Sequence, residues 1–248
     1  MSEPDRRNAQ YAAEFVGTLV LVLAITGFVS ASSKALEIFP LAVVHGLALM
    51  GIVYTIGSIS GAHVNPAVTL ALLSIKKIGG RDAGFYILAQ VAGAIVGALL
   101  SRMFFDVRGA FVNYGTPSLS PDYLGGGSVG LGFIAEAVGA FILMWAVMGT
   151  AVNPDAPKGV AGAAIGGALA LGVLLFGPAT GASFNPARWF GPALVSGSWT
   201  DAWMYIIAPV VGAVGAAFAY LSIMKLSTPS VPTQTARKGE SAEPPVAV

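Results

Sequence analysis

The sequence carries two Asn-Pro-Ala triplets, whose amide side chains could bind a small polar molecule without adding charge. They are 120 positions apart and comprise Asn65, Pro66, Ala67, Asn185, Pro186 and Ala187. Proline is favourable at the first position of a helix, because its missing N–H would have no partner there. Each asparagine is therefore predicted to cap a short helix while its amide stays available as a hydrogen-bond donor.

Two such helices that met N-terminus to N-terminus would concentrate positive potential at their meeting point. Each would contribute about half a unit charge, a field that repels cations, including a hydrated proton. The amides could still donate to a water oxygen, and a water that donates to neither asparagine cannot pass a proton onward. A single triplet is best interpreted as an ordinary turn or cap, but two at matched positions favour the paired arrangement.

The composition predicts that these residues lie within a membrane. The 248 residues are 55% hydrophobic and 10% charged, with a mean hydropathy of +0.76, whereas soluble domains carry about 25% charged residues. At roughly 20 residues per crossing, six apolar stretches are expected to span: Tyr11–Ser32, Phe39–Ser58, Ala83–Phe105, Gly130–Val152, Gly159–Phe176 and Ala202–Met224. The formal charge of +1 gives no case for nucleic-acid binding, and the absence of cysteine excludes thiol chemistry.

The segments after the triplets differ from these spans in length. Each continues apolar for only about ten residues, which is too short to cross a bilayer and predicts a re-entrant half-helix. We expect a membrane domain over residues 11–226, after a cytoplasmic N-terminal tail over residues 1–10. Residues 227–248 are rich in proline, serine and charge, and are predicted to form a disordered cytoplasmic tail.

The membrane domain contains an internal repeat. The stretch Ala13–Gly17 is echoed by Ala135–Gly139 at an offset of 122, close to the offset of 120 between the triplets. These offsets predict two homologous halves, about 11–105 and 129–226. Because three spans is an odd number, the second half must be inserted upside down, which places a solute pathway at the repeat interface near the midplane.

Positive residues predict the orientation, since cytoplasmic loops carry the excess of lysine and arginine. With both termini cytoplasmic, in what we expect to be the plasma membrane, three such residues lie outside: Lys34, Arg102 and Arg108. Nine lie inside: Arg6, Arg7, Lys76, Lys77, Arg81, Lys158, Lys225, Arg237 and Lys238. The remaining one, Arg188, falls within the second re-entrant segment.

Together the paired triplets and the repeated motif around Glu14 and Glu136 resemble the major intrinsic protein family, the aquaporins and glycerol facilitators, over residues 11–225. The resemblance implies an all-α hourglass fold: six tilted transmembrane helices plus two re-entrant half-helices in an inverted repeat. It also implies a homotetramer with one pore per subunit that conducts water passively. No phosphate loop, metal-ligand cluster or paired nucleophile and base is found in the sequence, so neither enzymatic activity nor a cofactor is expected.

By the same resemblance, Arg188 belongs to the selectivity filter, although an arginine that only snorkels to the interface is the alternative. The other filter positions lie twenty residues before the first triplet asparagine, and twelve and three before the second: His45, Val173 and Ala182. Strict water channels carry phenylalanine, histidine and a small or polar residue there. The present set looks instead like the filter of plant tonoplast intrinsic proteins and their ammonia-permeable animal relatives. His45 could alternatively be a buried histidine bonded to a neighbour.

Three further polar residues are expected to brace the re-entrant loops. Glu14 and Glu136 are carboxylates inside apolar helices, where an unpaired charge is costly, so each is predicted to accept hydrogen bonds from a loop backbone. A proton relay is the alternative for both. His63 is expected to pack against its loop, with a direct pore role as the alternative.

Several functional alternatives remain open. A glycerol facilitator would carry aspartate after the filter arginine, where this chain has Trp189. A secondary transporter also uses inverted repeats, but the pore segments offer only Glu14 and Glu136 as coupling carboxylates. A closed structural protein would not need to retain both triplets and Arg188. We therefore expect water, ammonia and hydrogen peroxide to pass, glycerol to pass slowly at most, and ions and protons to be excluded.

Overall fold

The computed structural model describes residues 3–32 and 37–227, and within these ranges its regular structure is entirely helical. In chain order the elements are α1 (Glu3–Ala31), α2 (Ile38–Ser60), α3 (Pro66–Ser74), α4 (Gly80–Phe111), the 3-10 turn η1 (Asn113–Gly115), α5 (Val129–Val147), the π-helical η2 (Met148–Val152), α6 (Ala161–Thr180), α7 (Pro186–Ser196) and α8 (Ala202–Ser227). Six of the described helices are long and apolar enough to cross a membrane: α1, α2, α4, α5 continued by η2, α6 and α8. The expected all-α fold with six spanning helices is confirmed.

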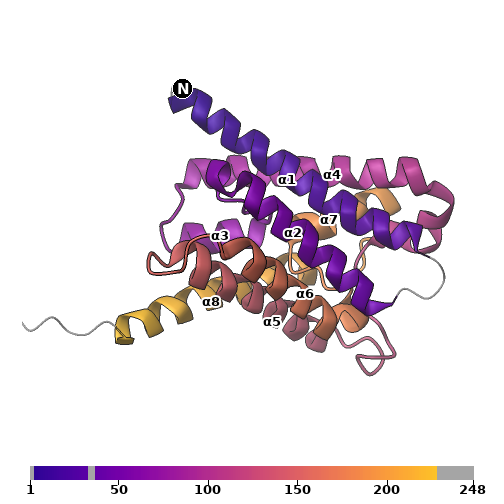
Figure 1. The fold of residues 1–248 in the computed structure, drawn as a ribbon. Coiled ribbons are helices and arrows are strands. Elements are labelled where there is room, and N and C mark those ends of the chain that lie inside the picture. Colours follow the sequence, from indigo (N-terminus) through magenta and orange to yellow (C-terminus); the bar gives the residue numbers. More distant parts are fainter. Residues whose placement is uncertain (1–2, 33–36, 228–248) are drawn as a thin grey trace, which may run out of the picture.

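The two helices that follow the triplets are too short to span. Helices α3 and α7 contain 9 and 11 residues, so at about 1.5 Å per residue each covers roughly half of a 30 Å hydrocarbon core. Both lie inside the bundle of longer helices (Figure 1). They are therefore half-helices, and their loops can enter the membrane only because the surrounding helices cover them.

Equivalent helices pair in the two halves of the chain. Helix α1 packs along α4, and α5 packs along α8 in the same way. In both pairs a glycine faces a backbone carbonyl: a Cβ atom at Gly93 would clash with the oxygen of Phe15, and one at Gly212 with the oxygen of Ala137. Small residues let helix backbones approach closely in lipid, and here they do so at matching places in each repeat.

A third glycine contact joins the two halves. Helix α2 of the first half packs against α6 of the second. A Cβ at Gly46 would lie 2.9 Å from the carbonyl oxygen of Gly166, and a Cβ at Gly166 would clash with the carbonyl oxygen of Gly46. Each glycine thus accommodates the other's backbone, as expected where two inverted repeats meet.

The helix boundaries differ from the predicted ones mainly at three places. Helix α1 begins at Glu3 rather than Tyr11, because acidic residues in its first turn suit the helix dipole and Arg7 pairs with Glu3 at 2.8 Å. Helix α4 continues to Phe111, past a non-helical Phe105 (φ −129°, ψ 29°) where the predicted span ended. Helix α6 runs on to Thr180 through Pro178. Except for Ser227, the tail predicted over 227–248 lies outside the described residues.

The described chain ends lie at the same end of the bundle. The start of α1 and the end of α8 are both on the left in Figure 1, while the end of α1 and the start of α2 are on the right. An even number of spans requires this arrangement, whichever side of the membrane the two ends occupy.

Candidate functional site

Asn65 and Asn185 cap the two half-helices. The side-chain oxygen of Asn65 accepts a hydrogen bond from the backbone N–H of Ala67 at 2.8 Å, and that of Asn185 accepts from Ala187 at 3.0 Å and Arg188 at 3.2 Å. Both asparagines have extended backbones and are followed by a proline at the first helical position. This is the capping geometry expected from the triplets.

The side-chain amide nitrogens of these caps donate hydrogen bonds from one half of the chain to the other. Asn65 Nδ2 donates to the carbonyl oxygen of Phe184 at 2.9 Å, and Asn185 Nδ2 donates to that of Val64 at 2.8 Å. Each half-helix is thereby bonded to the loop that leads into its counterpart. A primary amide has two N–H groups, so each asparagine keeps a second donor.

The loops before the half-helices are strained in matching ways. Four residues other than glycine have positive φ angles of 41° to 50°: Ala62, Val64, Ala182 and Phe184. Such a conformation is costly for residues with a side chain, and it persists only where the surroundings enforce it.

Glu14, on α1, hydrogen-bonds the first loop. Its Oε1 accepts from the Ser60 hydroxyl at 2.6 Å and the His63 N–H at 3.0 Å. Its Oε2 accepts from the Val64 N–H at 2.7 Å and the Gln90 amide at 2.8 Å. The carboxylate is fully buried, and these four donors replace the water it has lost.

Glu136, on α5, does the same for the second loop. It accepts from the Thr180 hydroxyl at 2.6 Å, the Ser183 N–H at 3.0 Å and the Phe184 N–H at 2.7 Å. The hydroxyl partners were not singled out from the sequence, yet Ser60-Gly61-Ala62 and Thr180-Gly181-Ala182 repeat the same small-residue pattern. Gln90 has no counterpart among the hydrogen bonds of Glu136, so no repeat could have identified it.

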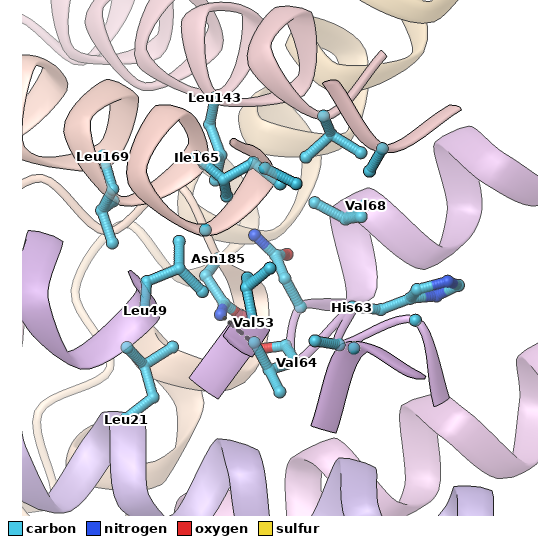
Figure 2. A pocket seen from close by; sticks show the side chains of 18 of the residues that line it. Leu21, Leu49, Val53, His63, Val64, Val68, Leu143, Ile165, Leu169 and Asn185 are labelled. Carbon is cyan, nitrogen blue, oxygen red and sulfur yellow. Dashed lines mark hydrogen bonds between the residues drawn. The ribbon is translucent and has the colours of Figure 1, made fainter. Parts of the chain in front are cut away.

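A cavity of about 650 Å³ lies where the half-helices meet. Both capping asparagines line it, and Figure 2 shows Asn185 surrounded by the aliphatic side chains of Leu49, Val53 and Ile165. The lining is therefore mostly apolar, with a few polar groups at defined positions, as in sites that bind small molecules.

His45 and Arg188 also line this cavity and are almost completely buried. His45 Nδ1 is 2.8 Å from the carbonyl oxygen of Leu41, and Arg188 Nη1 donates to the carbonyl oxygen of Gly115 at 3.0 Å. Nε2 of the histidine and Nε of the arginine have no hydrogen-bond partner among the described residues. Two buried polar atoms, one on each residue, thus lie unpaired beside the cavity.

The other expected filter residues have different surroundings. Val173 and Ala182 are completely buried, but neither belongs to the lining of this cavity. His63 does line it, and its Nδ1 is 3.1 Å from the Thr69 hydroxyl while its ring packs edge-on against Tyr86 at 5.0 Å. The structure thus brings together His45, His63, Arg188 and the capping asparagines around this cavity, and Val173 and Ala182 are not part of its lining.

Comparisons with known proteins agree with this architecture. The model of the family described as "Major intrinsic protein" matches residues 4–220. "Aquaporin NIP1-1" of Zea mays is 42% identical over 211 residues, which cover 84% of this chain and 72% of the relative. "Nodulin-26" of Glycine max is 38% identical over 215 residues, covering 84% and 75%.

A solved structure shares the fold. The aquaglyceroporin of Plasmodium falciparum superimposes with a TM-score of 0.75 at 24% identity, covering 89% of this chain and 98% of that one. At this identity the likeness concerns the arrangement of helices alone.

Proposed function

The chain belongs to the major intrinsic protein family, and from that premise we propose that it is a passive pore for water and small neutral solutes that excludes ions and protons. Its relatives are aquaporin channels, so the chain is a multi-pass membrane channel rather than an enzyme. The observation that carries the proposal is the cavity lined by Asn65, Asn185, His45 and Arg188.

The polar groups of this cavity suit a neutral permeant better than a cation. The two half-helices direct about half a unit of positive charge each toward the capping asparagines, and Arg188 adds a full charge. The amide N–H groups and the guanidinium of Arg188 are donors, and a water or ammonia molecule can accept a hydrogen bond from them. We propose that this combination lets small neutral acceptors pass and repels cations.

The carboxylates support a passive pore over coupled transport. The described residues that line the cavity include no aspartate or glutamate. Glu14 and Glu136 are instead engaged by four and three hydrogen-bond donors of their own loops and neighbours. We propose that they brace the loops, with His63, and carry no protons through the membrane.

For the solute range, we propose that His45, Val173, Ala182 and Arg188 form the filter and that it admits ammonia and hydrogen peroxide besides water. A glycerol facilitator is the second candidate, because the family that the sequence resembles comprises glycerol facilitators as well as aquaporins. Glycerol needs an apolar wall beside its carbon backbone, which Val173 supplies only in part. We therefore expect slow glycerol flux at most.

The same family membership is the basis for proposals on the oligomeric state, the membrane and the orientation of the chain. We propose a channel domain over residues 11–226, a homotetramer with one pore per subunit, and cytoplasmic ends in the plasma membrane. The charge bias of the connecting segments supports this orientation, since Lys76, Lys77, Arg81 and Lys158 lie on the side of the chain ends.

Stopped-flow light scattering on reconstituted vesicles tests the proposal. Water and ammonia flux should exceed those of protein-free vesicles, and glycerol and urea flux should rise little. A proton-gradient dye in the same vesicles should report no added leak. Uptake of a solute against its gradient, or water flux equal to that of protein-free vesicles, would contradict a passive water pore.

A further inference from the structure

The guanidinium of Arg188 is held by one backbone carbonyl. Its Nη1 donates to the oxygen of Gly115 at 3.0 Å, and its Nε has no partner among the described residues. Because this is the one hydrogen bond that the described residues give its side chain, the direction of the Gly115 peptide group helps to set where the buried guanidinium lies in the cavity.

That peptide group belongs to an unusual turn. Three consecutive residues have positive φ angles: Asn113 at 46°, Tyr114 at 49° and Gly115 at 72°. Glycine adopts this conformation without penalty, but asparagine and tyrosine adopt it at a cost, and the cost is highest for bulky side chains. Surrounding contacts must therefore hold the turn in place.

The side chain of Tyr114 makes several of those contacts. Its ring lies directly on α4 at Gly109, where an added Cβ would be only 2.6 Å from the ring. Its hydroxyl donates to Asp106 at 2.7 Å, and the Arg102 guanidinium lies 5.4 Å from the ring centroid. Although it follows a helix end, Tyr114 is only 8% exposed.

Of these contacts, the packing of the ring outweighs the charged pair beside it. Arg102 and Asp106 are 3.3 Å apart, but their side chains are 51% and 63% exposed, and ion pairs that exposed contribute little. The ring of Tyr114 is buried against Gly109, whose missing side chain leaves the space that the ring fills, so its place is set mainly by shape.

We propose that Tyr114, seated on Gly109, is a positioning residue for Arg188 and thereby limits which solutes pass. It acts through the carbonyl of the adjacent Gly115 and does not itself touch the permeant. This inference rests on the proposed function, in which Arg188 borders the permeation path.

The test uses substitutions that move the ring without touching the cavity. Gly109→Ala places a methyl group against the ring, and Tyr114→Ala removes the ring; Tyr114→Phe removes only the hydroxyl. Gly84→Ala is the matched control, because on the same helix nothing lies within 4 Å of its added Cβ. The readout is the ratio of glycerol to water flux in vesicles containing equal amounts of folded protein.

Gly109→Ala and Tyr114→Ala should raise this ratio by about threefold, the scale set by losing one hydrogen bond at Arg188. Tyr114→Phe should change it less, and Gly84→Ala should leave it unchanged. If Tyr114→Ala does not fold, Gly109→Ala decides. Parallel losses of both fluxes at a constant ratio would show a merely structural role and overturn the inference.

Arg188→Val separates this inference from the proposed function. If Arg188→Val leaves the ratio unchanged, the proposed filter itself is wrong. If Arg188→Val raises the ratio while Gly109→Ala and Tyr114→Ala do not, only the positioning role of Tyr114 is overturned.

Discussion

Asn185 Nδ2 donates a hydrogen bond of 2.8 Å to the carbonyl oxygen of Val64, 121 positions earlier in the chain. The bond ties the second half-helix to the loop that leads into the first. In the reciprocal bond, the Asn65 amide donates to the carbonyl oxygen of Phe184 in the loop that leads into the second. The capping residues are therefore polar groups of the cavity and also join the two repeats, so substitutions there should affect selectivity as well as the fold.

Replacing Asn185 with aspartate should weaken cation exclusion. The carboxylate would cancel part of the positive potential of the half-helix N-termini. It would also lack the N–H that now donates a hydrogen bond to the carbonyl oxygen of Val64. We expect proton or sodium leak to rise about tenfold, which corresponds to about 1.4 kcal/mol off the barrier. Dye-loaded vesicles measure it, with Asn153→Asp, outside the cavity lining, as the control. An unchanged leak would mean that the half-helix field does not exclude cations.

Exchanging the filter histidine tests how selectivity is set. The double substitution His45→Phe with Val173→His restores the pattern of strict water channels and should lower the ratio of ammonia to water flux. We expect a change of about threefold or more, within what one side-chain contact can discriminate. Each single substitution serves as a control, and is needed because Val173 lies outside the cavity lining. A constant ratio in the double variant would show that the residues counted from the triplets are not the filter.

Replacing Glu136 with glutamine should destabilise the second loop. Glutamine keeps one acceptor oxygen but turns an NH₂ group toward a donor, leaving a buried N–H or hydroxyl unpaired at a cost of about 1–3 kcal/mol. A chain of this size loses about 2–4 °C in Tm per kcal/mol. Thermal unfolding in detergent, followed by near-ultraviolet circular dichroism, measures it. Glu3→Gln, on an exposed side chain, should not change Tm.

Adding a methyl group at Gly212 should separate α8 from α5. Its Cβ would clash with the carbonyl oxygen of Ala137, a backbone atom that cannot move aside alone. Gly215→Ala on the same helix is the matched control, since its Cβ meets nothing within 4 Å. We expect Gly212→Ala to lower Tm by several degrees, as overpacking typically costs about 1–3 kcal/mol. Equal Tm values for both variants would show that the helices are not in close contact here.

Most of the helical framework could be predicted from the sequence, because the apolar stretches are long enough to span a membrane and the repeated motifs share nearly one offset. The positions of Glu14 and Glu136 at one offset anticipated that both would face equivalent loops, and their contacts are equivalent. Gln90 could not be anticipated, since it has no counterpart in the second repeat and only the packing of α4 on α1 brings it to Glu14.

The turn at Tyr114 could not be predicted for a different reason. In Asn113-Tyr114-Gly115, asparagine and glycine are residues that favour a positive φ angle, but tyrosine is not, and the structure has all three in succession. Its conformation depends on Gly109 and Asp106, which come from the preceding helix beyond an interruption at Phe105. Similarly, counting residues along a helix located Val173, but counting does not reveal whether its side chain lines the cavity, and here it does not.

The reciprocal bonds between the caps and loops impose an order on biosynthesis. Asn65 reaches its partner carbonyl only after 119 more residues have been made. At about 5–20 residues per second, the first half-helix therefore waits roughly 6 to 24 s for that partner. During this interval the hydrogen bonds from Ser60, His63 and Val64 to the Glu14 carboxylate can already form. The first loop can therefore fold before the Asn65 amide is bonded to Phe184. The nascent chain thus holds the first half-helix without its partner until translation supplies the second half-helix.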